Sequence, residues 1–99
     1  MSKKIELQPF DIAEYLDSEE MISAYLSEVL ETGDTNDFIS ALGDVARARG
    51  MTELAAKTGL GRESLYKTLS YGSKPRFDTV MKITQALGIK LEVKQAVRA

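Results

Sequence analysis

The stretch MTELAAKTGLGRESLYKTL, residues 51–69, decides the fold of this chain. Its spacing predicts a helix-turn-helix, in which two short helices cross steeply over a tight turn. The crossing needs a small residue where the helices approach each other, and Ala55 is placed to supply it. The turn needs a residue that tolerates positive φ, and Gly59 meets that need. Apolar anchors stand on both helices at the required spacing: Leu54, Leu60 and Leu65.

Two threonines leave a second interpretation of this stretch open. Thr58 and Thr68 occupy positions that the motif usually fills with aliphatic side chains, although the neighbouring Leu69 can take the second role. Threonine has the shape of valine but carries a hydroxyl group, so the pattern is imperfect. A plain antiparallel helix pair in a small bundle is therefore the alternative to a DNA-binding unit.

The charge of the chain is divided unequally between its two halves. Residues 1–45 carry eleven acidic and two basic side chains, whereas residues 46–99 carry four acidic and eleven basic ones. The net charges are therefore −9 and +7, which together make the −2 of the whole chain. This asymmetry favours an anionic polymer as partner of the basic half and a basic protein as partner of the acidic half. An ordinary solvated surface explains either half taken alone.

The composition of the 99 residues excludes several classes of protein. The absence of Cys and His removes thiol nucleophiles, disulfides, histidine-based catalysis and the usual zinc sites. No apolar run approaches the ~20 residues of a membrane span, and the N-terminal MSKKIELQPF lacks the apolar centre of a signal peptide. We therefore expect a cytoplasmic protein that is not an enzyme and does not contact a membrane, with no catalytic residue, metal site or cofactor.

Helical periodicity predicts a mainly α fold, a five-helix bundle with short strands at the two ends of the chain. Asp17 with Glu20, and Asp34 with Asp37, have the spacing of capping boxes, which begin helices. Thr52 is the predicted N-cap of the third helix. The five helices are expected over residues 17–32, 34–49, 52–58, 62–70 and 77–87.

The strands and the core follow from the same patterns. Ile5 and Leu7 alternate with polar residues near the N-terminus, and residues 89–93 alternate in the same way, which is typical of strands. These two pieces can pair with each other or across a dimer. The residues expected in the core rather than in a site are Leu54, Leu65, Phe77 and Leu87.

We expect a single domain over residues 1–99. Residues 1–33 form an acidic N-terminal extension with the first helix, residues 34–88 form the helix-turn-helix core that binds DNA, and residues 89–99 form a C-terminal strand and tail. One core of this size is marginally stable by itself, so a partner or a second subunit is expected to add buried surface.

The chain resembles a known family over nearly its whole length. Residues 41–87 resemble the Xre and lambda-repressor-like helix-turn-helix family. More closely, ALGDVARARGMTELAAKTGLGRESLYKTLS and KPRFDTVMKITQALGIKL look like HigA-like addiction-module antidote proteins, and the upstream FDIAEYLDSEEMISAYLSEVLETGD is similar to the same group. One departure is Gly61, because such proteins commonly have Ser or Thr at this helix N-cap, where Gly caps slightly less well.

This resemblance implies a lambda-repressor-like fold and a small antitoxin with two activities. The antitoxin neutralises a co-expressed toxin, in this group typically a RelE/ParE-like protein that is small and basic. It also binds double-stranded operator DNA and represses its own operon. Because one recognition helix makes too few contacts for tight binding, we expect a homodimer on a palindromic site. The alternative is a stand-alone helix-turn-helix transcriptional repressor without a toxin partner.

The candidate residues for reading DNA bases stand on the second helix of the motif, whose N-terminal part faces base edges. Arg62 can bind guanine with both arms of its guanidinium group, and Glu63 can accept from the cytosine amino group. The competing interpretation is a surface ion pair between Glu63 and Lys67. Tyr66 can either contact a base or pack at the edge of the helix, and the sequence favours neither interpretation. The predicted base-reading residues are Arg62, Glu63, Ser64, Tyr66 and Lys67.

The candidate phosphate contacts flank that helix. Thr52 offers a hydroxyl group and backbone N–H groups at a helix N-terminus, although an ordinary N-cap would have the same features. Ser73, Lys74 and Arg76 follow the recognition helix, in the loop where the resembling family meets the DNA backbone. Arg47 is expected in solvent.

The candidate toxin contacts lie near the N-terminus. Four apolar side chains precede the first helix in the acidic half of the chain, and apolar anchors usually supply the affinity of an interface. We expect them to bind the toxin, and the alternative is that they pack under the first helix as core. These residues are Phe10, Ile12, Tyr15 and Leu16.

Overall fold

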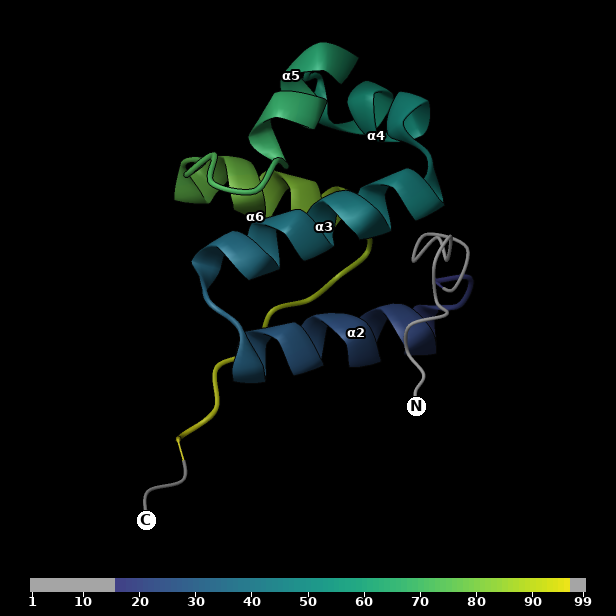
Figure 1. Ribbon diagram of the computed structural model, residues 1–99. Coiled ribbons are helices and arrows are strands. Elements are labelled where there is room, and N and C mark those ends of the chain that lie inside the picture. The colour runs from purple at the N-terminus through teal and green to yellow at the C-terminus, as the bar shows by residue number, and fades with distance from the viewer. Residues whose placement is uncertain (1–15, 97–99) are drawn as a thin grey trace, which may run out of the picture.

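The computed structural model describes residues 16–96 of the chain. In this part of the protein α3 lies in the middle, with α2 on one side of it and α4 and α5 on the other (Figure 1). The mainly α class predicted from the sequence is confirmed. None of the described helices is both long and apolar enough to cross a membrane. The five helices are α2 (Glu19–Thr32), α3 (Thr35–Arg49), α4 (Met51–Thr58), α5 (Arg62–Thr68) and α6 (Phe77–Ala86).

The predicted C-terminal strand is wrong. Residues 89–96 follow α6 without regular secondary structure, and no strand occurs between residues 16 and 96. The alternation of apolar and polar residues provides the pattern of a strand, but a strand also needs a neighbour that takes up its backbone hydrogen bonds. No described segment serves as that neighbour. The other predicted strand, around Ile5 and Leu7, lies outside the described residues.

Local hydrogen bonds set the beginning of α2 and α3. The N-cap of α2 is Ser18, whose hydroxyl oxygen accepts from the backbone N–H of Met21 at 3.1 Å, so the predicted cap at Asp17 is wrong by one residue. The capping box predicted at the start of α3 is confirmed. The Asp34 carboxylate accepts from the Asp37 backbone N–H at 2.9 Å, and the Asp37 carboxylate accepts from the Asp34 N–H at 3.0 Å.

The core is one apolar cluster built around α3. Leu42 and Val45 of α3, Leu65 of α5 and Ile83 of α6 are each 0% exposed, and Leu54 of α4 is 2% exposed. Burying a side chain of this kind contributes about 1.5–3 kcal/mol. Helix α3 packs mainly against α2 and α4, and α4 in turn packs against α5 and α6.

One predicted core residue lies on the surface instead. Leu54, Leu65 and Leu87 are buried as expected, but Phe77 is 74% exposed. Phe77 is the first residue of α6, whereas Ile83, on the buried side of the helix, lies six residues further along. Phe77 therefore lies one to two turns before the part of α6 that the rest of the described chain covers.

The turn between α4 and α5 has the predicted geometry. Gly59 has a φ of +77°, in the left-handed region that favours glycine. Thr58 is buried, and its hydroxyl group donates to the Leu54 carbonyl oxygen at 2.8 Å and accepts from the Leu60 N–H at 3.2 Å. These bonds explain how a threonine replaces the expected aliphatic residue, because its hydroxyl group satisfies backbone groups at the turn.

At Gly43, α3 lies close to the residue that follows α5. A Cβ atom at this position would lie 2.7 Å from the carbonyl oxygen of Leu69, which is shorter than any ordinary contact. Leu69 itself is only 6% exposed, in the role suggested for it by the sequence. The absence of a side chain at Gly43 therefore lets α5 pack against α3.

We predict that Gly43→Ala lowers the free energy of unfolding by about 1–3 kcal/mol, because a backbone oxygen cannot move aside cheaply. The measurement is urea unfolding followed by circular dichroism. Gly61→Ala is the matched control, since nothing lies within 4 Å of a Cβ atom there. Its change should be within about 0.5 kcal/mol, because weaker capping and lower chain entropy oppose each other. Equal unfolding midpoints for the two variants would contradict the close approach.

Candidate nucleic-acid interface

The predicted base-reading residues share one short helix, α5. Leu65 is 0% exposed and anchors the helix in the core. The other side of the helix faces solvent, and none of the candidate side chains on it is buried. The five exposed candidates are Arg62, Glu63, Ser64, Tyr66 and Lys67. The fold therefore places on the exposed surface of one helix the five residues that the sequence predicts to read bases.

Within this row, Arg62 lies against Tyr66. The guanidinium carbon of Arg62 is 5.9 Å from the centroid of the Tyr66 ring, within the range of a cation–π interaction. Glu63 and Lys67, both described, form no ion pair with each other. Between residues 16 and 96, neither the Glu63 carboxylate nor the Lys67 ammonium group takes part in an ion pair.

The four predicted phosphate contacts differ in what surrounds them. Thr52 is exposed at the second position of α4, and the N-cap is Gly50 rather than Thr52, because the buried Met51 is already helical. Ser73 donates its hydroxyl hydrogen to the Thr68 carbonyl oxygen and so closes the loop after α5.

The remaining two phosphate candidates are cations near the start of α6. Lys74 is exposed and adopts a φ of +56°, an uncommon conformation for a residue other than glycine. The Arg76 guanidinium group is 3.4 Å from the carboxylate of Asp78, which offsets part of its charge. Lys74 is therefore the more available cation of the loop.

The predicted toxin contacts fall outside the described residues, with one exception. Leu16 is 2% exposed and belongs to the core cluster with Ile22 and Leu26. Its position matches the alternative in which this residue packs under the first described helix. Phe10, Ile12 and Tyr15 lie outside the described residues.

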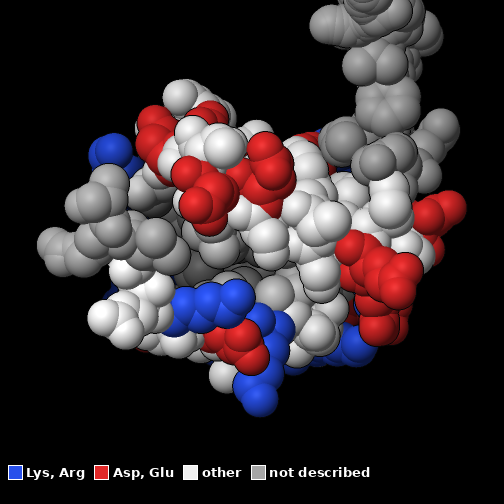
Figure 2. All heavy atoms as spheres, turned by 90° about the horizontal axis from the view of Figure 1, so that it is seen from below, with Lys and Arg blue, Asp and Glu red and all other residues white. Residues whose placement is uncertain are grey.

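Acidic side chains gather at the other end of the molecule from α5. Helix α2 carries four glutamates and neither Lys nor Arg. Figure 2 looks at the molecule from the α2 side and shows acidic groups spread over this face. In Figure 1, α2 and α5 lie at opposite ends of the helix stack. Basic groups also lie on this face, and Arg49 of α3 is 3.6 Å from the Glu19 carboxylate of α2, so the charge division of the sequence is only partly a division in space. The four residues are Glu19, Glu20, Glu28 and Glu31.

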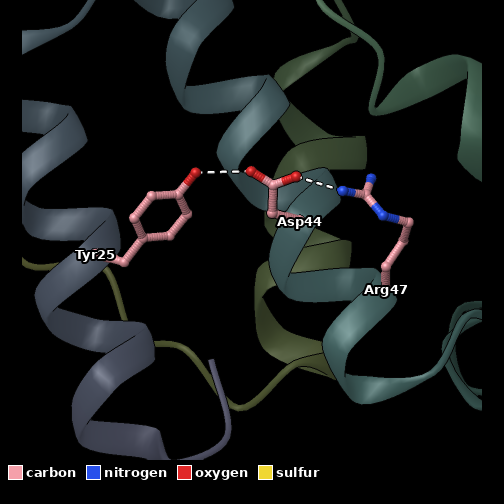
Figure 3. A network of polar contacts seen from close by, with 3 residues as sticks. All are labelled: Tyr25, Asp44 and Arg47. Atoms are coloured by element: carbon pink, nitrogen blue, oxygen red, sulfur yellow. Dashed lines mark hydrogen bonds and ion pairs between the residues drawn. The ribbon is translucent and has the colours of Figure 1, made fainter. Parts of the chain in front are cut away.

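A polar network joins α2 to α3 (Figure 3). The Tyr25 hydroxyl group donates to one carboxylate oxygen of Asp44 at 2.7 Å, and the Arg47 guanidinium group donates to the other. Burial, followed by the hydrogen bond to Asp44, raises the pKa of the Tyr25 phenol above its ordinary value. The phenol is thus held in its neutral form as a donor.

This network also fixes a cation beside α5. Arg47, Tyr66 and Tyr71 line a hollow of about 290 Å³ between α3 and α5. Arg47 is exposed, as the sequence indicated, but its place beside α5 was not predicted. The three-residue spacing of Asp44 and Arg47 is a signal for their ion pair, but nothing local in the sequence indicates the contact with Tyr25.

Comparison with known proteins decides the family. A family model described as "probable addiction module antidote protein" matches residues 6–95. The chain belongs to this family. It is also 47% identical over 91 residues to an uncharacterised protein of Haemophilus influenzae strain Rd, in an alignment that covers 92% of this chain and 94% of that protein. No solved structure matches the chain.

Membership in the antidote family supports an antitoxin and implies a toxin as its partner. The predicted antidote class is thereby confirmed. The finer predictions are a HigA-like subgroup, an Xre or lambda-repressor-like DNA-binding motif and a RelE/ParE-like toxin, and these stay predictions.

We predict that Tyr25→Phe lowers the free energy of unfolding at neutral pH by about 1–2 kcal/mol, because it removes the donor to the partly buried Asp44 carboxylate. Urea unfolding measures the loss. Tyr71→Phe is the matched control, because the Tyr71 side chain is 64% exposed. The control should unfold like the wild-type chain, and an equal loss in both variants would argue against the network.

The pH dependence of the same variant follows from the raised pKa of Tyr25. A group whose pKa rises on folding stabilises the protein fully below its ordinary pKa, which is ~10 for tyrosine, and loses this contribution as the pH rises further. The stability advantage of the wild-type chain over Tyr25→Phe should therefore be constant between about pH 7 and 9 and shrink above about pH 10. An advantage that persisted undiminished in alkaline buffer would contradict a raised pKa.

Proposed function

We propose that this antidote neutralises a co-expressed RelE/ParE-like toxin and represses its own operon as a cytoplasmic DNA-binding protein. The observation that carries the DNA-binding part is the exposed row on α5, held by the buried Leu65 and placed away from the acidic α2. A negative face repels phosphate, so a DNA-binding surface belongs at the end of the molecule that α2 leaves free. The two ends then serve two partners.

In the proposed complex, α5 enters the major groove as the second helix of a helix-turn-helix. Arg62 binds guanine through two hydrogen bonds, and Glu63 accepts from the amino group of cytosine. The Tyr66 ring holds the Arg62 guanidinium group in position, since the guanidinium carbon already lies 5.9 Å from the centroid of the ring. Ser64 and Lys67 complete the set of side chains that reach bases or the adjacent backbone.

The flanking residues position the helix without reading sequence. Thr52 donates from the first turn of α4, and Lys74 and Arg76 add positive charge after α5, where they neutralise phosphates. Ser73 contributes by holding the loop closed through its bond to Thr68. A second copy of the chain doubles these contacts on a palindromic site.

We predict that Arg62→Ala weakens binding to the operator by about 1–3 kcal/mol and has little effect on a scrambled duplex, because a base contact is lost. Fluorescence anisotropy with both duplexes measures the two affinities. Arg62→Lys is the matched control, because it keeps the charge but lacks the planar fork. It should retain affinity for the scrambled duplex and still lose preference for the operator. Equal losses on both duplexes in Arg62→Ala would remove its role in base reading.

We predict that Lys74→Gln weakens binding to operator and scrambled duplexes alike and reduces the salt dependence of binding by about one phosphate contact per subunit. The measurement is the slope of affinity against salt concentration. Lys90→Gln is the control, because Lys90 borders a groove on the α2 side of the molecule. That variant should bind DNA as the wild-type chain does. A slope unchanged by Lys74→Gln would exclude a phosphate contact.

We predict a homodimer on operator DNA, with the two recognition helices about 34 Å apart so that they meet successive turns of the major groove. Sedimentation equilibrium of the chain with and without an operator duplex measures its state. Two chains per duplex are expected. A monomer in both conditions would refute the two-fold arrangement.

We predict that a chain lacking residues 1–15 no longer neutralises the toxin but still binds the operator, because Phe10, Ile12 and Tyr15 are the proposed anchors in that segment. Leu16 is kept in this variant because it belongs to the core. Growth rescue in cells that express the toxin measures neutralisation, and anisotropy measures DNA binding. Full rescue by the shortened chain would move the toxin contact onto the described helices.

A further inference from the structure

A groove of about 760 Å³ runs between α2, α6 and residues 89–94. Apolar side chains in its walls are open to solvent: Leu30 is 57% exposed, Phe77 is 74% exposed and Leu91 is 38% exposed. Apolar surface of this kind marks an interaction site. The charged side chains of the lining balance each other, so the groove suits an occupant with the same balance of charge. These residues are Glu31, Lys90, Glu92 and Lys94.

The C-terminal wall of the groove has the pattern of a strand but no neighbouring strand. In Figure 1 this segment runs from α6 toward α2 without coiling. The Ile89 backbone N–H donates to the carbonyl oxygen of Thr84 in α6 at 2.9 Å. Beyond it, residues 90–96 are exposed, and their backbone groups form no hydrogen bond to any residue between 16 and 96. The segment therefore offers backbone groups as well as apolar side chains to an occupant.

Only one edge of this segment suits a new strand. In an extended chain, the backbone groups of successive residues point to opposite edges. The edge of Ile89 faces α6 through the bond to Thr84. Lys90 and Glu92 therefore share the opposite edge, where a second strand can take up their N–H and carbonyl groups.

The charges of the segment complement one another when two copies of it run antiparallel about Leu91. Lys90 of each copy then lies opposite Glu92 of the other, which is a favourable cross-strand pair. Ile89 lies opposite Val93, so apolar side chains also match. The hydrogen-bonded pairs in this register are those of residues 90 and 92. The Ile89 N–H thus keeps its bond to α6.

Other antiparallel registers on the same edge fit less well. Pairing centred on Glu92 places this carboxylate opposite its own counterpart, and like charges directly opposite each other are destabilising. Pairing centred on Val93 lets Glu92 meet Lys94 but places Leu91 opposite the polar Gln95. The register centred on Leu91 is therefore the one that matches both faces of the segment.

We propose that a second copy of this chain occupies the groove, and that residues 89–93 of the two copies form an antiparallel ribbon centred on Leu91. The apolar side chains of the ribbon cover the groove of each copy, where Leu30 and Phe77 add apolar contact. Two strands alone are marginally stable in water, so this packing against the helices is needed to hold the ribbon.

This surface rests on the homodimer of the proposed function and identifies where that homodimer forms. The two-fold axis of such a pair is perpendicular to the ribbon, so both copies lie on its apolar side. The groove borders α2, and α5 lies at the other end of the helix stack (Figure 1). The ribbon therefore leaves the exposed residues of α5 uncovered in both copies, and it uses none of residues 1–15, which are proposed to bind the toxin.

A single cysteine tests the register, because the chain has no cysteine of its own. In the proposed ribbon, the Cα atoms of the two Leu91 residues face each other about 4.5 Å apart, within reach of a disulfide. Leu91→Cys should therefore cross-link most of the dimer under mild oxidation. Non-reducing gel electrophoresis measures the cross-linked fraction.

Val93→Cys is the matched control for the cysteine variant. Val93 is fully exposed, so a thiol there is at least as accessible as one at Leu91. In the proposed register, however, the two Val93 residues stand about 14 Å apart along the ribbon, too far for a disulfide. Val93→Cys should stay largely uncross-linked. Preferential cross-linking through Val93→Cys would overturn the proposal.

Charge exchange tests the pairing of Lys90 with Glu92. Both side chains are exposed, so their substitution removes no core packing. Lys90→Glu and Glu92→Lys each place like charges opposite each other twice in the dimer. Each should raise the dimer dissociation constant about tenfold in sedimentation equilibrium. The double variant restores opposite charges and should return to within about threefold of wild type. Equal weakening in the single and double variants would contradict the pairing.

Mixing the two single variants tests whether the contact joins two copies. In a heterodimer of Lys90→Glu with Glu92→Lys, opposite charges face each other at both positions. The mixture should therefore dimerise about tenfold more tightly than either variant alone. No gain on mixing would overturn the proposal. Lys90→Gln keeps an amide that can donate to Glu92 of the second copy, so its dimer should stay within about threefold of wild type.

The remaining outcomes separate this proposal from the proposed function. If the wild-type chain is a monomer with and without operator DNA, the proposed homodimer fails and the ribbon fails with it. If the wild-type chain is a dimer that Leu91→Cys does not cross-link and the charge variants do not weaken, the homodimer stands and the ribbon is overturned.

Two results would assign the groove to another occupant. If Leu91→Cys cross-links only after residues 1–15 are removed, the segment pairs with the N-terminal part of its own chain, and the proposal is overturned. If Phe77→Ser weakens toxin binding in surface plasmon resonance and leaves the dimer intact, the groove belongs to the toxin, and the proposal is likewise overturned.

Discussion

The close packing of α3 against the end of α5 is the constraint on which the rest of the structure depends. Gly43 leaves no side chain between α3 and the Leu69 carbonyl oxygen, and the fully buried Leu42 and Val45 lie one residue before it and two residues after it. With α5 anchored there, only its outer residues remain for a partner. The next residue, Asp44, binds Tyr25 and so ties α2 to the opposite side of α3. One helix therefore positions both ends of the molecule.

The separation of charge follows from this arrangement. A small chain has one core and little interior, so nearly all of its charged side chains lie on the surface. Since α3 lies between α2 and α5, the glutamates of α2 and the exposed residues of α5 stand at opposite ends of the helix stack, although Arg49 still forms an ion pair with Glu19 of α2. In the function proposed above, α2 attracts a basic protein and α5 meets phosphate without a movement of the chain.

Polar groups inside the structure are satisfied locally, and this keeps so small a core ordered. Thr58 closes the turn between α4 and α5 through the Leu54 carbonyl oxygen, and Thr84, which is 0% exposed, donates to the Met81 carbonyl oxygen. Unpaired, such groups would each cost about 1–3 kcal/mol. Among the described residues, the large apolar side chains that remain exposed include Leu30, Tyr71 and Phe77.

The sequence by itself determined the features that depend on neighbours along the chain. The box between Asp34 and Asp37, the positive φ of Gly59 and the outward row on α5 all follow from spacing, because capping, turn geometry and helical period act within a few residues. Only the tertiary structure decided that residues 89–93 lack a strand partner, that Phe77 is exposed, and that Tyr25 meets Asp44. These outcomes depend on residues far apart in sequence, whose distances are set by the packing of whole helices.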